Sequence, residues 1–246
     1  MSSTHPFVFV AMGTMVSLTS VQPLDRATQD TVISAFVDLE ERFSLYRDDT
    51  EASRFARGEL NLHTVSDAFR SAYDEAILWR IATGGAFTPH RPDGVVDLSG
   101  IIKAFGIRNA GRALREAGVT DWCLNAGGDV LTSGRSADGE AWVVGIVDPA
   151  DRTELFTQFT TGDERWAVAT SGIAERGEHI WRMAADDTFV QVTVCARDIV
   201  TADVLATAIL AGGREALARA QELDDIDVLA CSAGEKVYAS RCFLAA

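Results

Sequence analysis

The stretch Phe189-Val-Gln-Val-Thr-Val-Cys-Ala196, with the chain that follows it, decides the fold class. Its valines alternate with polar side chains, and this period of two is typical of a half-exposed β-strand. A helix is predicted next, over about residues 202–223, and strands near 226–231 and 236–241, joined around Gly234, would form a hairpin. A strand, a helix and then a hairpin favour an α+β fold over an alternating parallel α/β fold.

The rest of the chain repeats this mixture. Two strand segments, 7–10 and 15–21, are interrupted at Met12-Gly13-Thr14, where glycine allows a close backbone approach and a ligand contact. Apolar spacing predicts helices over 24–43, around 69–77 and over 100–117, and strands are predicted at 122–125 and 142–147. No repeat or linker divides the 246 residues, so we expect one domain spanning 1–246.

The charge balance limits the partners of the chain. It carries 36 acidic against 22 basic side chains, and the formal net charge of -14 repels nucleic acids and anionic membrane surfaces. An anionic ligand therefore needs local cations or a metal ion. The 4 cysteines form no zinc-type cluster and are interpreted as buried thiols. The N-terminal residues contain neither a signal-peptide core nor a membrane span, so we expect a cytoplasmic protein without membrane insertion.

Two glycine-containing segments are candidate ligand contacts. In Asp97-Leu-Ser-Gly-Ile-Ile-Lys103 a carboxylate and an ammonium flank a glycine at a predicted strand-to-helix transition. Such a helix N-terminus suits phosphate, and Lys103 could neutralise a diphosphate; an ordinary capped helix with a solvent-facing lysine is the alternative. Asn125-Ala-Gly-Gly-Asp129 either lets the backbone lie against a flat ligand or is a simple turn. No strand–GxGxxG–helix order occurs, which argues against a Rossmann cofactor site.

Three further residues have the chemistry of a metal site and a general base. Asp203 and Thr207 lie one helical turn apart, so their oxygens share a helix face, and Mg²⁺ prefers oxygen ligands. The alternative for Asp203 is an electrostatic helix cap. His179 lies in a polar, glycine-punctuated segment beside two glutamates and is the best candidate general base. A surface histidine without a role is the alternative.

Taken in chain order, these segments resemble the ApbE family of FAD:protein FMN transferases from Met12 to about Gly213. No single block is decisive, but the ordered set is highly specific. The blocks are Met12-Gly-Thr14, Tyr46 with Ser53-Arg-Phe55, Ala86-Phe-Thr88, Asp97 to Lys103, Asn125 to Asp129, Trp142 to Pro149, Thr170-Ser-Gly172, His179, and Ala202 to Thr207.

The resemblance implies a T-fold-related α+β fold, with mixed or antiparallel sheets and packed helices, and a reaction. FAD would be the substrate, Mg²⁺ would act on its diphosphate, and FMN would be attached to a Ser or Thr hydroxyl of a target protein with release of AMP. His179 would assist that hydroxyl. By resemblance, Met12, Tyr46, Ala86, Phe87, Thr88, Asp97 and Lys103 would line the FAD site, while Asp203, Thr207 and the carbonyl of Gly100 would hold Mg²⁺.

The chain departs from the family pattern at several places. The segment between His179 and Phe189 is short, Ala104 and Asn109 stand where relatives often have Gly and Asp, and no lipobox is seen. Acceptor proteins are therefore expected in, or facing, the cytoplasm. Two other functions would use the same FAD residues: an FAD pyrophosphatase that gives FMN and AMP, and a non-catalytic FAD-binding protein whose altered loop no longer supports transfer.

Overall fold

The computed structural model describes residues 4–162, 165–173, 189–234 and 236–244. Its centre is an 8-stranded sheet in the order β1-β2-β3-β4-β7-β8-β9-β10, and a second, 2-stranded sheet pairs β5 with β6. The strands are β1 (His5–Ala11), β2 (Thr14–Ser20), β3 (Trp122–Ala126), β4 (Asp129–Ser133), β5 (Val143–Val147), β6 (Leu155–Thr160), β7 (Ala167–Gly172), β8 (Phe189–Ala196), β9 (Asp227–Ser232) and β10 (Val237–Ala239). The helices are α1 (Arg26–Phe43), α2 (Glu51–Ala56), α3 (Asp67–Ala82), α4 (Ser99–Glu116), α6 (Ile199–Leu223) and α7 (Arg241–Leu244).

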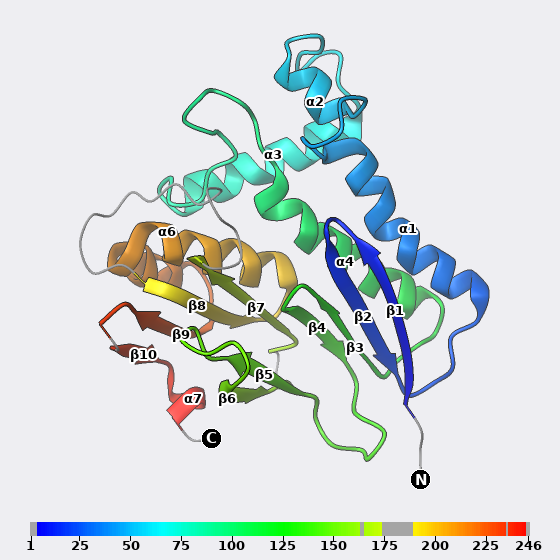
Figure 1. Ribbon diagram of the computed structural model, residues 1–246, viewed down its shortest axis with the longest axis vertical. Helices are drawn as coiled ribbons and strands as arrows, with labels where there is room; N and C mark the ends of the chain where they lie inside the picture. The colour runs from blue at the N-terminus through cyan, green and yellow to red at the C-terminus, as the bar shows by residue number, and fades with distance from the viewer. Residues whose placement is uncertain (1–3, 163–164, 174–188, 235, 245–246) are drawn as a thin grey trace.

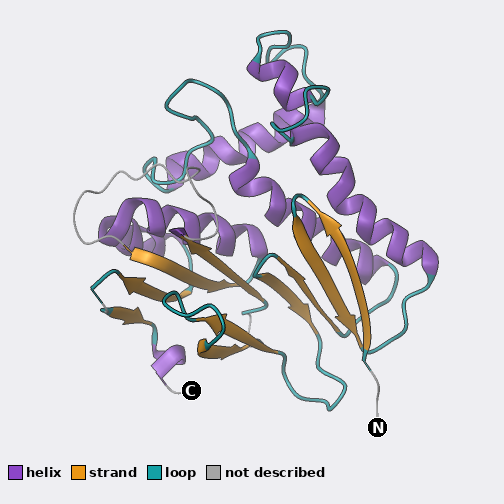
Figure 2. Ribbon diagram, in the orientation of Figure 1, coloured by secondary structure: helices purple, strands orange, loops and turns teal. Residues whose placement is uncertain are grey.

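All neighbouring strands are antiparallel, and the large sheet has a different covering on each face (Figure 1). Helices α1, α4 and α6 pack on one face, whereas the β5–β6 hairpin and α7 lie over the other (Figure 2). Because side chains alternate along a strand, Leu131 of β4 joins the helix-side core while Val130 joins the smaller core with Phe159 and Phe243. The structure thus confirms an α+β fold with antiparallel sheets and packed helices.

Several helices begin where a side-chain oxygen satisfies a free N–H group. Asp25 caps α1 by accepting from the N–H of Thr28 at 2.8 Å, and Asp198 caps α6 by accepting from Val200. Helix α4 follows Leu98 and has no side-chain N-cap hydrogen bond. The N–H of Ser99, the first residue of α4, donates instead to Oδ1 of Asp97 at 2.9 Å.

The structure confirms most of the predicted elements and corrects three points. The predicted hairpin near the C-terminus is present, with Val237 opposite Cys231. The predicted strand that leads directly into α4 is absent, because Val96 forms only an isolated bridge with His90. Strands β4, β6 and β7 and the short helices α2 and α7 were not predicted, and α7 begins at Arg241, where the predicted strand was to end.

The third correction concerns the cysteines, which are all free thiols. Cys195 and Cys231 are buried as predicted, Cys123 is half-buried, and Cys242 is exposed, so the prediction of a buried thiol is wrong there. Within the described part of the chain, no helix combines the length and the apolar character that crossing a membrane requires.

Candidate functional site

Two tight hairpin turns meet at one end of the large sheet. Met12 and Gly13 join β1 to β2 with φ of 52° and 69°, and Gly127 and Gly128 join β3 to β4 with φ of 61° and 94°. Positive φ at both central residues is the geometry that matches the twist of paired strands. A Cβ atom on Gly127 would stand 2.7 Å from Oγ1 of Thr14, so only glycine allows the two turns to approach this closely.

Hydrogen bonds hold these turns in place. The N–H of Met12 donates to Oε2 of Glu40 on α1 at 2.8 Å, and the N–H of Gly127 donates to the carbonyl of Met15 at 3.2 Å. Asn125 accepts from the N–H of Gly128 at 2.9 Å through Oδ1. Gly127 and Gly128 therefore form the turn between β3 and β4, which lies directly beside the Met12 turn.

The next residue after this turn, Asp129, forms an ion pair with Lys103 of α4. The Asp129 side chain is fully buried and that of Lys103 is 18% exposed, so the lysine does not face solvent. Oδ1 of Asp129 also accepts from the N–H of Thr170 on β7 at 3.1 Å. The pair thus joins α4, β4 and β7. The sequence pointed to the segment that ends at Asp129 but gave its carboxylate no role.

Asp203 and Thr207 lie on α6, close to the end of β7. Asp198 is the N-cap of α6, so Asp203 is not the cap, and its side chain is only 1% exposed. Oγ1 of Thr207 lies 3.1 Å from Oγ of Ser171, the residue after the Thr170 that contacts Asp129. Thr207 and the Lys103–Asp129 pair therefore contact neighbouring residues of one strand.

This donor set has the chemistry of a magnesium site. A carboxylate, a hydroxyl and a backbone carbonyl are hard oxygen ligands, and Mg²⁺ commonly completes its shell with water and substrate phosphates. No group of three or more His, Cys, Asp or Glu side chains that could hold a metal occurs among the described residues. Any metal bound here would depend on hydroxyl and carbonyl oxygens as well as on Asp203.

The Ala86-Phe87-Thr88 segment bridges α4 and α6. The N–H of Phe87 donates to Oγ1 of Thr83 at 3.1 Å, and a Cβ on Gly100 would stand 3.3 Å from the Phe87 ring. A Cβ on Gly212 of α6 would stand 3.0 Å from the Cβ of Ala86. This segment consequently packs against both helices that carry the candidate metal residues.

Asp97 extends the same loop toward α4. Its N–H donates to the carbonyl of Pro89 at 2.8 Å, and its Oδ1 accepts from the N–H of Ser99 at 2.9 Å. Oγ1 of Thr88 accepts from the N–H of His90 at 3.2 Å. Nε2 of His90 lies 3.0 Å from the Tyr73 hydroxyl. Burial, together with nearby Arg80, lowers the pKa of His90. His90 is therefore neutral at pH 7, and sequence reasoning had assigned it no role.

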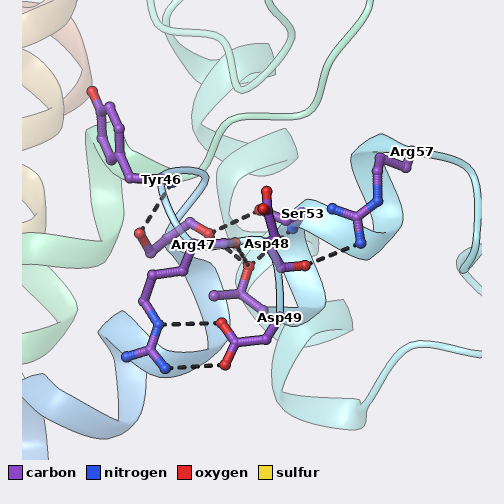
Figure 3. Close-up of polar contacts among 8 residues, drawn as sticks. Tyr46, Arg47, Asp48, Asp49, Ser53 and Arg57 are labelled. Carbon is purple, nitrogen blue, oxygen red and sulfur yellow. Dashed lines mark hydrogen bonds and ion pairs between the residues drawn. The ribbon is translucent and has the colours of Figure 1, made fainter.

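Tyr46 lies in the turn between α1 and α2 (Figure 3). Oγ1 of Thr50 donates to the carbonyl of Ser44 at 2.6 Å and accepts from the N–H of Ser53, which closes the turn and caps α2. The Tyr46 side chain is 86% exposed, and its ring points away from the polar cluster of the turn. None of the contacts described above reaches Tyr46. His179, the predicted base, lies outside the described residues.

Fold and site together define a class of protein. It is an α+β protein with a helix-backed antiparallel sheet, in which a buried aspartate, hydroxyls and a lysine–carboxylate pair gather where α4 and α6 meet the sheet. Such a set suits a metal-assisted anionic ligand. The chain belongs to the ApbE family, whose model matches residues 12–92 and 88–230.

Named relatives and solved structures agree with this family. The FAD:protein FMN transferase of Vibrio cholerae serotype O1 is 27% identical to this chain, over 94% of the chain and 89% of that protein. The structure of the flavin transferase ApbE from Vibrio cholerae aligns with a TM-score of 0.82 at 24% identity, covering 100% of this chain and 99% of that one. The ApbE protein of Thermotoga maritima aligns with a TM-score of 0.78 at 19% identity, covering 99% of each chain. Structural likeness at these identities establishes the fold.

Proposed function

We propose that this chain is an Mg²⁺-dependent FAD:protein FMN transferase that uses FAD as its substrate. It attaches FMN to a Ser or Thr hydroxyl of a target protein and releases AMP. The observation that carries the proposal is the ApbE-family match over residues 12–92 and 88–230, with a named FAD:protein FMN transferase related over 94% of the chain. The oxygen donors and the lysine described above agree with that activity.

The residues of the site have separate tasks in this reaction. Asp203, Thr207 and the carbonyl of Gly100 would hold Mg²⁺, which polarises the FAD diphosphate when it is bound. Lys103 places an ammonium near the diphosphate, and the fully buried Asp129 fixes the direction of that ammonium. Phosphoryl-type transfer needs mainly positioning and charge neutralisation, so this arrangement requires no covalent enzyme nucleophile.

The bond changes are those of a single displacement. The acceptor hydroxyl oxygen forms a bond to the phosphorus of the FMN half, the P–O bond to AMP breaks, and His179 takes the hydroxyl proton. Met12, Ala86, Phe87, Thr88 and Asp97 line the FAD site in this proposal. The exposed Tyr46 ring offers a flat face on which an aromatic ring of FAD can stack.

The direct test incubates the protein with FAD, Mg²⁺ and candidate acceptor proteins and then looks for flavin fluorescence in a denaturing gel. A fluorescent acceptor band supports transfer. Release of FMN and AMP with no labelled acceptor would instead identify an FAD pyrophosphatase. Intact FAD that persists with excess Mg²⁺ would identify a non-catalytic FAD-binding protein.

The metal assignment is tested by Asp203→Ala. Loss of the buried carboxylate should lower Mg²⁺-dependent turnover by roughly 100-fold or more, because a bound metal supplies several kcal/mol of charge stabilisation. Asp224→Ala is a suitable control, since it removes an exposed carboxylate at the other end of α6 and should leave turnover unchanged. Circular dichroism should show the same fold in both variants. Full turnover in Asp203→Ala would remove this residue from the metal site.

The base assignment is tested by His179→Ala. A general base acts in the chemical step, so the transfer rate should fall by roughly 10²-fold or more while the affinity for FAD changes little. Stopped assays at saturating FAD measure the rate, and equilibrium titration measures the affinity. Equal losses in both quantities would show that His179 contributes to binding only.

A further inference from the structure

A second cavity, lined by arginines, lies away from the candidate FAD site. Its volume is about 230 Å³. It adjoins Ser133, the last residue of β4, whereas Asp129 begins that strand, so about 13 Å of strand separates the two places. Asp198 lines the cavity and Thr207 lies about 13 Å further along α6. The residues that carry the argument are Arg108, Arg115, Ser133, Trp166, Arg197 and Asp198.

The three arginines reach the cavity from two parts of the fold. Arg108 and Arg115 are two turns apart on α4 and so share one face of the helix, and Arg197 lies in the connection between β8 and α6. Like charges gathered around one cavity repel one another, and this arrangement occurs in a chain whose net charge is -14. An anion between the guanidinium groups would remove that repulsion.

Neighbouring side chains hold two of the arginines in position. The Arg108 guanidinium binds both carboxylate oxygens of Glu75, at 2.9 Å and 3.3 Å, and lies 4.3 Å from the centre of the Phe105 ring. Two of its N–H-bearing nitrogens face Glu75, so further N–H donors of the group stay available. The Arg115 guanidinium lies 6.0 Å from the centre of the Trp122 ring. These contacts orient the two groups before any ligand binds.

Among the described residues, the acidic groups beside the cavity have hydrogen-bond or ion-pair partners of their own. Oδ1 of Asp198 accepts from the N–H groups of Val200 and Thr201, and its Oδ2 accepts from the Thr201 hydroxyl at 2.6 Å. Glu75 is used by Arg108. Asp225 forms an ion pair with Arg165 at 2.8 Å, and it also interacts electrostatically with Arg197. Of the charged side chains that line the cavity, three are arginines and one is the carboxylate of Asp198, so this lining carries more positive than negative charge.

We propose that this cavity is a binding site for a phosphate group, either inorganic phosphate or the phosphate of a small metabolite. Guanidinium groups match phosphate oxygens in paired hydrogen bonds, and a tetrahedral phosphate presents oxygens to donors that arrive from several directions. A carboxylate has only two oxygens and one charge. The cavity has room for a phosphate and a few waters within its 230 Å³. This site is separate from the proposed FAD site and does not depend on the proposed function.

Calorimetric titration with inorganic phosphate at constant ionic strength and neutral pH tests the proposal. The wild-type protein should bind phosphate saturably, and Arg115→Gln should weaken the affinity by roughly ten- to a hundred-fold, the value of hydrogen bonds to a charged partner. Arg197→Gln should act in the same direction. Arg112→Gln is the matched control, because Arg112 is on the same helix, is 67% exposed and does not line the cavity. It should bind phosphate as the wild type does.

Any one of three results would overturn the proposed site. The first is that the wild-type protein shows no saturable binding of phosphate up to about 10 mM. The second is an unchanged affinity for phosphate in both Arg115→Gln and Arg197→Gln, and the third is an equal loss of that affinity in Arg112→Gln. A second arm compares inorganic phosphate with glycerol 3-phosphate, which separates a site for the free ion from a site for a phosphate ester. FAD affinity is measured in Arg115→Gln as well. An equal loss of FAD affinity would show that the arginines belong to the FAD site, whatever the fate of the transferase proposal.

Discussion

Lys103 has a setting that depends on residues far away in the sequence. Its position at the start of a helix predicted a cation for a phosphate, and the helix is where the sequence placed it. The partner Asp129 begins β4, directly after the turn from β3, and the N–H of Thr170 from β7 completes the group. A local pattern indicates which side chains are chemically able to act, but only the pairing of distant strands decides which carboxylate meets the lysine.

Asp129→Asn should lower both stability and activity. The substitution leaves the Lys103 ammonium without its buried partner, and we expect the free energy of unfolding to fall by about 2–4 kcal/mol, slightly less than for a fully buried pair. Urea unfolding measures this loss, and the KM for FAD should rise because the ammonium is no longer directed. Asp93→Asn, which disrupts an ion pair whose carboxylate is 51% exposed, should change stability little. Equal effects of the two substitutions would contradict the role of Asp129.

Asp203 shows the limit of reading a single residue from its neighbours. The sequence left open whether it was a helix cap or a metal ligand. The structure excludes the helix cap, because α6 begins three residues earlier than predicted and Asp198 is its cap. Whether the buried Asp203 carboxylate binds Mg²⁺ stays a prediction, as do the roles of the other site residues.

At the scale of elements, periodicity predicted the long helices and missed several strands for a physical reason. Helices α1 and α4 each bury one face, so their apolar residues recur at helical spacing. Strands β4 and β7 are covered on both faces, by helices on one and by other apolar residues on the other, so no alternation of polar and apolar residues marks them. Helix α2 has only 6 residues and depends on its Thr50 cap, which leaves too short a pattern to detect.

The contact between α1 and α4 depends on a glycine. A Cβ on Gly106 would stand 2.7 Å from Cδ1 of Phe36, which is fully buried on α1. Gly106→Ala should therefore lower the free energy of unfolding by about 1–3 kcal/mol through overpacking, although alanine by itself favours a helix by about 1 kcal/mol. Gly234→Ala is the control, because no atom lies within 4 Å of its Cβ position. A stabilised Gly106→Ala protein would show that the two helices separate easily.

At the scale of the whole molecule, one sheet with a core on each face organises the chain, and the candidate site residues that the structure describes lie on the helices, loops and turns around it. The α+β class could be predicted because a strand, a helix and a hairpin follow one another near the C-terminus. The separation of β5 and β6 from the large sheet could not, since no local pattern tells a strand which sheet it joins. The single-domain organisation, the relation to the T-fold and the cytoplasmic location stay predictions.

The molecule as a whole should lose stability at alkaline pH, because folding raises the pKa of all its thiols. Burial raises the pKa of Cys123 from its ordinary value of 9.0 to about 11, and it raises those of Cys195 and Cys231 as well. Partial desolvation and the neighbouring Asp227 carboxylate raise the pKa of the exposed Cys242 to about 12. Between the pKa of a thiol in the unfolded chain and its higher pKa in the folded chain, the unfolded chain has lost a proton that the folded chain keeps. Stability therefore falls as pH rises above 9, and the contribution of Cys123 alone reaches about 2 kcal/mol near pH 11.

Urea unfolding at several pH values between 8 and 11 measures this effect, and Cys123→Ala isolates the contribution of one thiol. Other groups also titrate in this range, but their contributions are common to both proteins and cancel in the difference. The stability of Cys123→Ala should decline less steeply with pH, so that the two curves differ by about 2 kcal/mol more at the alkaline end than at the neutral end. Parallel curves would mean that the Cys123 thiol ionises as easily in the folded chain as in the unfolded one, and that this part of β3 is open to water.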